Sequence, residues 1–104
     1  MRRLVVSAAA RADIHDVARF TEAHWGKNQK KKYLAVLNAA LKRVRRNPEH
    51  GRRRIDIDPS LFSLLAGRHV IFYRIFDDHC RVVRITHDRM DAHRLLIDPP
   101  SEQF

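Results

Sequence analysis

Arg74 and Arg84 each lie inside an apolar, strand-like run of the chain. Arg74 belongs to the run 67–76 and Arg84 to the run 80–87, and both runs are rich in aromatic and β-branched residues. A guanidinium in such surroundings must reach a carboxylate, a phosphate or water, because an unpaired buried charge is strongly destabilising. On adjacent strands the two side chains could share a concave, basic sheet face that binds an anion. The alternative is that both extend to solvent at the margin of the sheet.

A pair of nearby carboxylates raises the question of acid–base catalysis. Asp56 and Asp58 form such a pair in the connection 51–59. They alternate with two isoleucines and follow a run of three arginines. This pattern favours a surface ion-pair segment or an edge strand over a catalytic pair.

The histidines and the single cysteine predict neither a metal centre nor a disulfide. Cys80 has no second cysteine in the chain, and a lone cysteine in a strand is most often a small buried hydrophobic residue. The seven histidines lack cysteine or carboxylate neighbours at ligand spacing. We therefore expect no metal and no other cofactor.

The two apolar runs predict a β-hairpin at the centre of a sheet, joined by a tight connection at 77–79. In the first run, apolar residues occupy both parities, which is typical of a strand covered on both faces. A preceding strand is expected at 61–66. Short links between these three strands predict an antiparallel meander.

Two amphipathic helices precede these strands. The short apolar run 2–6 predicts an N-terminal strand that joins the sheet, and Ser7 can cap the helix that follows. We expect this helix at 8–25 and a second at about 28–46, from the spacing of their apolar residues. A short link between two long helices forces an antiparallel helix hairpin whose apolar stripes need a sheet to cover them.

The order of elements describes one α+β domain: strand, helix, helix, three strands and a short closing helix. The closing helix is expected at 92–97, capped by Asp91, and residues 99–104 are expected to form a loose tail. We therefore predict a single domain at 1–98, with the helix hairpin packed on one face of an antiparallel sheet.

The charge of the chain favours an anionic partner. Its 104 residues include 21 Lys and Arg against 12 Asp and Glu, which gives a net charge of +9. Such a field favours nucleic acid, an acidic protein or an anionic surface. Many of the cations lie on the outer face of the second helix, where solvation is the commoner explanation and no aromatic residue is present to stack on bases.

Export and membrane insertion are disfavoured. The apolar stretch 4–10 is at the lower limit for a signal peptide and is followed at once by charged residues. No apolar run approaches the ~20 residues that a membrane span needs. We therefore expect a cytoplasmic protein.

Six sequence features, taken together, resemble the ParE branch of the RelE/ParE toxin superfamily. They are Ser7 before the first helix, Asp13-Ile14 within it, Trp25-Gly26 at its end, Asn47-Pro48 with Gly51 after the second helix, and the two strand motifs at 67–74 and 83–91. The resemblance covers roughly residues 3–96, and the two strand motifs are specific in combination. It implies the RelE/ParE-like fold.

The resemblance implies a bacterial type II toxin, of the kind found in plasmid stabilisation systems, that is neutralised by a ParD-like antitoxin. Such antitoxins typically bind through an acidic, amphipathic C-terminal segment, which fits the positive net charge. ParE-branch toxins are mostly described as poisons of DNA gyrase that act by protein contact, whereas the RelE branch cuts messenger RNA on the ribosome. Repression in this family belongs to the antitoxin, so we expect any contact with operator DNA to be indirect.

The ribonuclease alternative assigns chemistry to particular residues. Cleavage through the 2′-hydroxyl needs proton-transfer groups and cations for the developing phosphorane charge. Arg74 and Arg84 could supply the charge, with His87 or His69 transferring protons. The RelE branch is usually marked by a lysine-rich stretch leading into the sheet, and the predicted sheet here contains no lysine. Gyrase inhibition without catalytic residues is therefore the favoured function.

The binding residues that we expect fall into two groups. For the antitoxin we expect Arg68, Arg74, Arg84 and Arg89 to pair with carboxylates and Phe20 to lie in an apolar groove near the helix hairpin. Trp25 and Leu34 could contribute to this groove, but their positions on the apolar stripes favour the protein core. For the target we favour Arg89, Met90, Arg94 and Leu95, because a C-terminal element with Met and Leu offers an adaptable apolar contact.

Overall fold

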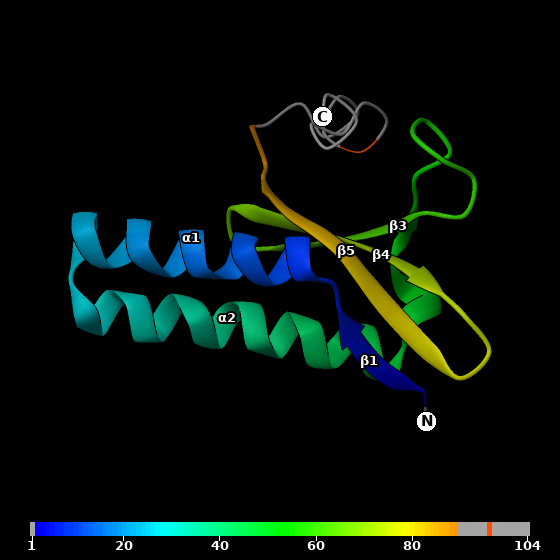
Figure 1. The fold of residues 1–104 in the computed structure, drawn as a ribbon, viewed down its shortest axis with the longest axis horizontal. Helices are drawn as coiled ribbons and strands as arrows, with labels where there is room; N and C mark the ends of the chain where they lie inside the picture. Colours follow the sequence, from blue (N-terminus) through cyan, green and yellow to red (C-terminus); the bar gives the residue numbers. More distant parts are fainter. Residues whose placement is uncertain (1, 90–95, 97–104) are drawn as a thin grey trace.

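The computed structural model of the chain describes residues 2–89 and Leu96, and within them the predicted α+β architecture is confirmed (Figure 1). The helices are α1 (Ala8–Trp25) and α2 (Lys27–Arg46), followed by a 3₁₀ turn at Pro48–His50. The strands are β1 (Arg3–Val6), β2 (Arg52–Arg53), β3 (Phe62–Ala66), β4 (His69–Ile75) and β5 (His79–His87). They form one sheet in the order β1-β5-β4-β3-β2.

The sheet is mixed, which corrects the expectation of a wholly antiparallel sheet. Strands β3, β4 and β5 form the predicted antiparallel meander. Strand β1, however, pairs in parallel with β5, with Leu4 opposite Cys80. A tight turn imposes antiparallel pairing, but β1 is joined to the rest of the sheet through the helix hairpin. Its direction therefore follows from the packing of α1 and not from a turn.

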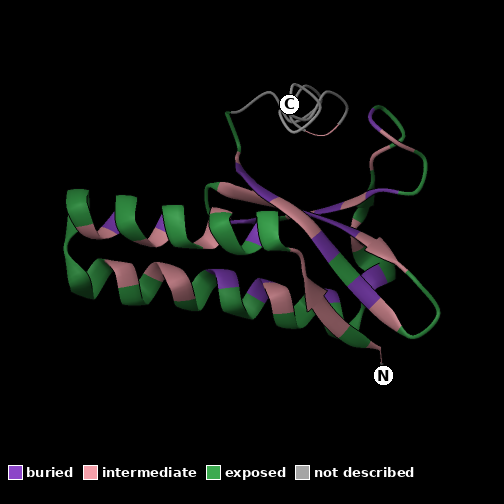
Figure 2. Cartoon of the chain, viewed as in Figure 1, coloured by how far each residue is buried: buried purple, intermediate pink, exposed green. Residues whose placement is uncertain are grey.

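The helix hairpin covers one face of the sheet, and the main core lies between the two layers (Figures 1 and 2). Helix α2 is amphipathic, and its buried positions recur at a spacing of three or four residues, as one face of a helix requires. The buried residues of this core include Ala10 and Val17 of α1, Leu37, Ala40 and Val44 of α2, Ile71 and Tyr73 of β4, and Val82 and Ile85 of β5.

A second, smaller core lies against the opposite face of the sheet. Its buried members are Ile57, Leu61 and Phe72, with Leu96 packed against them. Phe72 lies between Ile71 and Tyr73 of the main core, so β4 alternates between two covered faces, as its sequence predicted. The loop 54–61 supplies two of the buried residues and thereby acts as part of the sheet's cover.

The polar parts of the chain fasten the elements together. Ser7 caps α1 by accepting a hydrogen bond from the Ala10 N–H at 3.0 Å, and its hydroxyl donates to the Val83 carbonyl of β5 at 2.9 Å. Asp56 pairs with Arg54, which confirms the surface ion-pair segment expected there.

Within the described residues, neither helix is long and apolar enough to cross a membrane. The predicted closing helix and tail lie outside the described residues, apart from Leu96.

Candidate functional site

A groove of about 1180 Å³ lies where the joined end of the helix hairpin meets the end of the sheet. Figure 1 shows the hairpin projecting beyond the sheet on this side. Helix α1 lines the groove with Val17 and Phe20 among other residues, and α2 lines it with Tyr33. The sheet contributes the end of β5 and the turn between β3 and β4.

The wall of the groove on the helix side is apolar and exposed. The Phe20 side chain is 60% exposed and stacks on His24, with a distance of 4.0 Å between ring centroids. Trp25 is 70% exposed and also lines the groove. The interpretation of Trp25 as a core residue is therefore wrong, because α1 outruns the sheet at this end. Leu34 packs against the main core, as its position on the stripe predicted.

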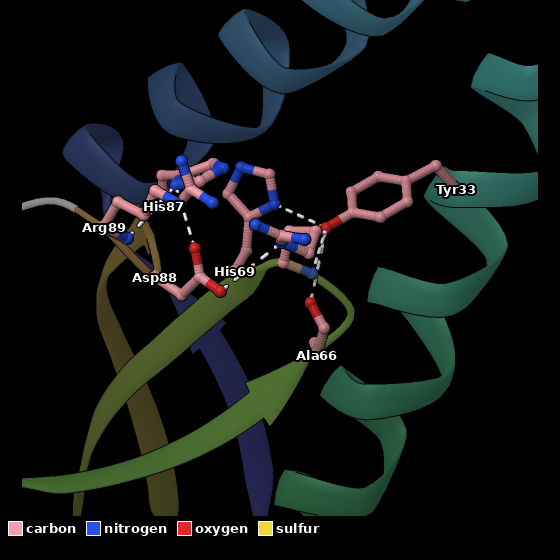
Figure 3. A network of polar contacts seen from close by, with 7 residues as sticks. Tyr33, Ala66, His69, His87, Asp88 and Arg89 are labelled. Carbon is pink, nitrogen blue, oxygen red and sulfur yellow. Dashed lines mark hydrogen bonds and ion pairs between the residues drawn. The ribbon is translucent and has the colours of Figure 1, made fainter.

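The wall on the sheet side carries a polar cluster around Tyr33 (Figure 3). The Tyr33 hydroxyl accepts a hydrogen bond from the Arg68 N–H at 2.9 Å. It lies 2.5 Å from His69 Nδ1 and 3.4 Å from the Ala66 carbonyl oxygen. The hydroxyl can donate to His69 Nδ1, which places the hydrogen of neutral His69 on Nε2, or donate to Ala66 and accept from His69 Nδ1.

Burial and the neighbouring imidazole keep His69 neutral. Burial lowers the pKa of His69, and His87 lowers it further, whereas Asp88 and Asp13 act in the opposite direction. The rings of His69 and His87 meet edge to face, with 5.3 Å between their centroids. Burial also raises the pKa of Tyr33, so its hydroxyl keeps the proton that it donates.

The other side of the cluster is formed by His87, Asp88 and Arg68. Asp88 lies 3.4 Å from Arg68 Nε, and its backbone N–H donates to the Arg68 carbonyl at 2.8 Å. His87 Nδ1 lies 3.0 Å from the Asp88 carboxylate and 3.1 Å from the Arg89 backbone nitrogen. One nitrogen cannot serve both partners at once, so Nδ1 donates to Asp88 when it carries a hydrogen and accepts from the Arg89 N–H when it does not.

Arg84 is bound within the molecule by a carboxylate from α1. Its Nε and Nη2 donate to the two Asp13 oxygens at 2.8 and 3.0 Å, and the Ile85 N–H donates to the same carboxylate at 2.8 Å. The hydrogen bonds to Asp13 raise the pKa of Arg84 against the opposing effect of burial, and both side chains are largely shielded from solvent. This pair fastens α1 to β5 next to the bulge, where the register shifts by one residue.

Arg74 is bound by a different element. Its guanidinium donates to Ser60 Oγ at 2.6 Å and lies 3.4 Å from the Asp58 carboxylate, both in the loop that covers the second core. The expectation that Arg74 and Arg84 share an open basic face is therefore wrong, because each is held by a carboxylate of its own. His87 lines the groove, and neither Arg74 nor Arg84 is among the residues that line it.

The remaining predicted residues fall at the groove and beyond it. Arg68 lines the groove, and Arg89 is exposed at the end of β5. Met90, Arg94 and Leu95 lie outside the described residues. Sequence reasoning missed Tyr33 as a member of the cluster, because it lies on the apolar stripe of α2. The available signal was its hydroxyl, since a buried tyrosine oxygen needs a partner.

Within the described residues, no three His, Cys, Asp or Glu side chains are grouped as a metal ion would require. The two histidines of the groove therefore remain available as hydrogen-bonding groups. What the groove can do chemically is bind a partner that presents apolar and anionic groups side by side.

Comparisons with known proteins agree on one family. The family model described as the ParE toxin of type II toxin-antitoxin systems, parDE, matches residues 4–92. Toxin ParE1 of Mycobacterium tuberculosis is 38% identical over 95 residues, which cover 90% of this chain and 97% of that protein.

Two solved structures share the fold. A chain of the chromosomal ParDE system from P. aeruginosa matches with a TM-score of 0.74 and 17% identity, over 84% of this chain and 96% of that one. A chain of the RelBE2 toxin-antitoxin complex from Mycobacterium tuberculosis matches with a TM-score of 0.55 and 24% identity, over 83% and 96% of the two chains. At these identities the two structures establish the architecture alone.

Proposed function

The chain belongs to the ParE toxin family of type II toxin-antitoxin systems, and we propose that it acts in the cytoplasm by binding and inhibiting DNA gyrase. The observation that carries this proposal is that the two strand arginines are already paired with carboxylates. Arg74 and Arg84 each bind a carboxylate of the same molecule, so their charge is already compensated. Stabilising a phosphorane would need open cations. Inhibition through contact, without chemistry of its own, is the function that fits.

A ParD-like antitoxin is the partner that fits the groove. The exposed rings of Phe20 and Trp25 form an apolar seat, and Arg68 lies across the groove from them. An acidic, amphipathic segment would place its apolar side on the rings and its carboxylates near the cations. To reach Arg74 as well, the segment would have to continue to the loop that covers the other face. Any contact with operator DNA remains indirect in this proposal.

The gyrase proposal is tested by mixing the purified protein with purified gyrase, ATP and supercoiled plasmid. We expect linear DNA after detergent and protease treatment, because a poisoned enzyme is trapped on cut DNA. A reaction without gyrase is the control for contaminating nucleases. Neither linear product nor loss of supercoiling would contradict gyrase as the target. Cleavage of messenger RNA on purified ribosomes would then be measured, with Arg84 and His87 as the residues to substitute.

The groove is tested through its aromatic seat. Phe20→Ser and Trp25→Ser should each weaken antitoxin binding by about tenfold or more, because exposed aromatic anchors dominate interface energies. Val36→Ser is the matched control, since Val36 is an exposed apolar residue of α2 outside the groove lining. Titration calorimetry measures the affinities. If Phe20→Ser and Trp25→Ser bind the antitoxin as tightly as Val36→Ser does, the antitoxin binds elsewhere on the toxin.

The C-terminal residues are our proposed contact with the target. Alanine at Met90, Arg94 and Leu95 together should abolish growth arrest while antitoxin binding persists. Arg89 is retained because it is also expected to pair with the antitoxin. Leu96 is retained in this variant because it packs against the second core. Unfolding in urea checks that the variant is folded. Full toxicity of a stably folded variant would contradict this assignment.

A further inference from the structure

We propose that His69, His87 and Arg68 form an anchoring site for one carboxylate at the sheet side of the groove, and that this site makes antitoxin binding tighter as the pH falls. The proposal deepens the function proposed above, because its carboxylate belongs to the acidic segment of the antitoxin. It concerns the one antitoxin carboxylate that binds at this site and the one proton that His69 takes up with it.

His69 offers a single directed donor. Its Nδ1 is occupied by the Tyr33 hydroxyl at 2.5 Å, and the protonated ring carries a hydrogen on Nε2 whichever way that contact is directed. Within the described residues Nε2 makes no hydrogen bond, although His69 is partly buried and lines the groove. Figure 3 shows its ring between Tyr33 and His87. The donor is thus fixed in direction by Tyr33 and lacks an acceptor from the described chain.

His87 adds a ring nitrogen and Arg68 a positive charge from the two sides. The Nε2 atom of His87 has no hydrogen-bond partner among residues 2–89, since the contacts of this ring there are made by Nδ1. Arg68 meets Asp88 through Nε at 3.4 Å, and its side chain is 60% exposed. Its terminal nitrogens are therefore open to an anion. Both residues line the groove together with His69.

The surroundings select a carboxylate on an amphipathic chain. Phe20 and Trp25 lie on the helix side of the same groove, so an occupant must cover exposed aromatic surface while delivering its negative charge. A free phosphate would satisfy the donors but leave the rings in water. A charge-assisted hydrogen bond in this partly buried place is stronger than one on an open surface.

The pH dependence follows from the protonation of His69. Burial and His87 lower the pKa of His69 in the free protein, so the ring is neutral near neutral pH. A bound carboxylate favours the charged ring, raises the pKa of His69 and draws in a proton. Because the bound form then holds more protons than the free form, affinity rises as the pH falls through the bound-state pKa. The groups that face this site are Asp13, Asp16 and Arg19 of α1, Tyr33 of α2, Arg68, His87 of β5, and Asp88 directly after it.

The site is tested first on the full chain alone, with sodium acetate as the probe. Nitrogen-15 NMR follows each imidazole between about pH 5 and pH 8, with sodium chloride at equal ionic strength as the reference. We expect acetate to raise the pKa of His69 and to shift the His87 ring, while the exposed His15 and His50 do not respond. No response at His69, or an equal response at all four rings, would overturn the proposal. 3-Phenylpropionate, a carboxylate that carries an aromatic ring, should bind tighter than acetate or inorganic phosphate because it also covers the exposed rings, and tighter binding of phosphate would overturn the choice of a carboxylate on an apolar carrier.

The second arm uses the antitoxin and two variants. His69→Phe keeps the ring but removes the donor, and Arg68→Ala removes the exposed cation without touching the core. Each should lower antitoxin affinity by about tenfold at pH 6, the size expected for a hydrogen bond to a charged group. His69→Phe should also flatten the pH dependence, whereas His50→Phe should leave both quantities unchanged.

The acetate titration and the antitoxin-binding measurements together distinguish the anchor proposal from the groove proposal. Wild-type affinity and pH dependence in both variants would overturn the anchor and leave the groove proposal standing. Failure of the antitoxin to bind the unaltered toxin would contradict the proposed partner, and the acetate titration would still test the anchor.

Discussion

At the scale of single residues, Tyr73 and Gly51 depend on each other. Tyr73 is buried in the main core, and its hydroxyl donates to the Pro48 carbonyl at 2.7 Å. A Cβ atom at Gly51 would overlap this hydroxyl, so only glycine leaves room for it. The turn after α2 is therefore tied to β4 through one tyrosine oxygen. Burial raises the pKa of Tyr73 to about 12.

The raised pKa of Tyr73 predicts a loss of stability in alkali. In the unfolded chain tyrosine ionises near pH 10, whereas the folded protein holds the proton until about pH 12. The stabilisation is complete below about pH 10 and is lost as the pH rises toward 12, with a total of about 2 to 3 kcal/mol. Urea unfolding at about pH 9 and about pH 11 measures the change, and Tyr73→Phe should show a smaller loss. An equal loss in the variant would assign the effect to other groups.

At the scale of elements, the loop 54–61 works as the cover of the sheet's second face. Leu61 is fully buried against Phe72, and Ile57 lies with it, while Ile55 in the same loop is 71% exposed. The loop is also fastened at both ends: Arg54 N–H donates to the Leu61 carbonyl at 2.8 Å, and Arg74 reaches Ser60. This element has little regular structure but contributes a core residue to the sheet.

Leu61→Ala should destabilise the protein by about 2 to 4 kcal/mol, because it removes buried methyl groups and leaves a cavity. Ile55→Ala, in the same loop, should cost less than about 0.5 kcal/mol. Urea unfolding monitored by circular dichroism measures both. Similar small losses for the two variants would mean that the loop does not act as a cover.

The sequence predicted those elements whose pattern is complete within one segment. Helix α1, the meander and the two covered faces of β4 all follow from local periodicity. The parallel direction of β1 did not, because no turn joins β1 to β5. Trp25 lies on the apolar stripe of α1, and nothing in that helix tells where the sheet below it ends. The Arg84–Asp13 pair could not be predicted from a local pattern either, because it joins residues 71 positions apart.

The candidate site could be predicted only in part for the same reason. Phe20 was recognisable at the edge of its helix's apolar stripe, and Arg68 by its place in a turn. The cluster of Tyr33, His69 and His87 depends on the register between β4 and β5 and on the height of α2 above their ends. Neither the strand register nor the position of α2 can be predicted from the sequence of a single segment.

At the scale of the whole molecule, the net charge of +9 predicts an association rate that depends on salt. An acidic antitoxin segment would be drawn toward the toxin from a distance, and salt screens that attraction. We expect the association rate constant to fall by about tenfold or more between about 0.05 M and 0.5 M sodium chloride, with a smaller change in the dissociation rate. Stopped-flow fluorescence of Trp25 measures both rates. A salt-independent association rate would show that the net charge does not steer binding.

The pairing of β1 with β5 also ties folding to the synthesis of β5. Among the described residues, the first strand pairs with the last, and Asp13 likewise pairs with Arg84 only after β5 is made. Pairings between such distant segments form late and slowly. A nascent chain that stops before β5 has an unpaired first strand, an unfastened first helix and no His87 in the groove. Translation that stops before β5 therefore yields fragments without the complete sheet, so the toxin's activity requires that the message be read past His87.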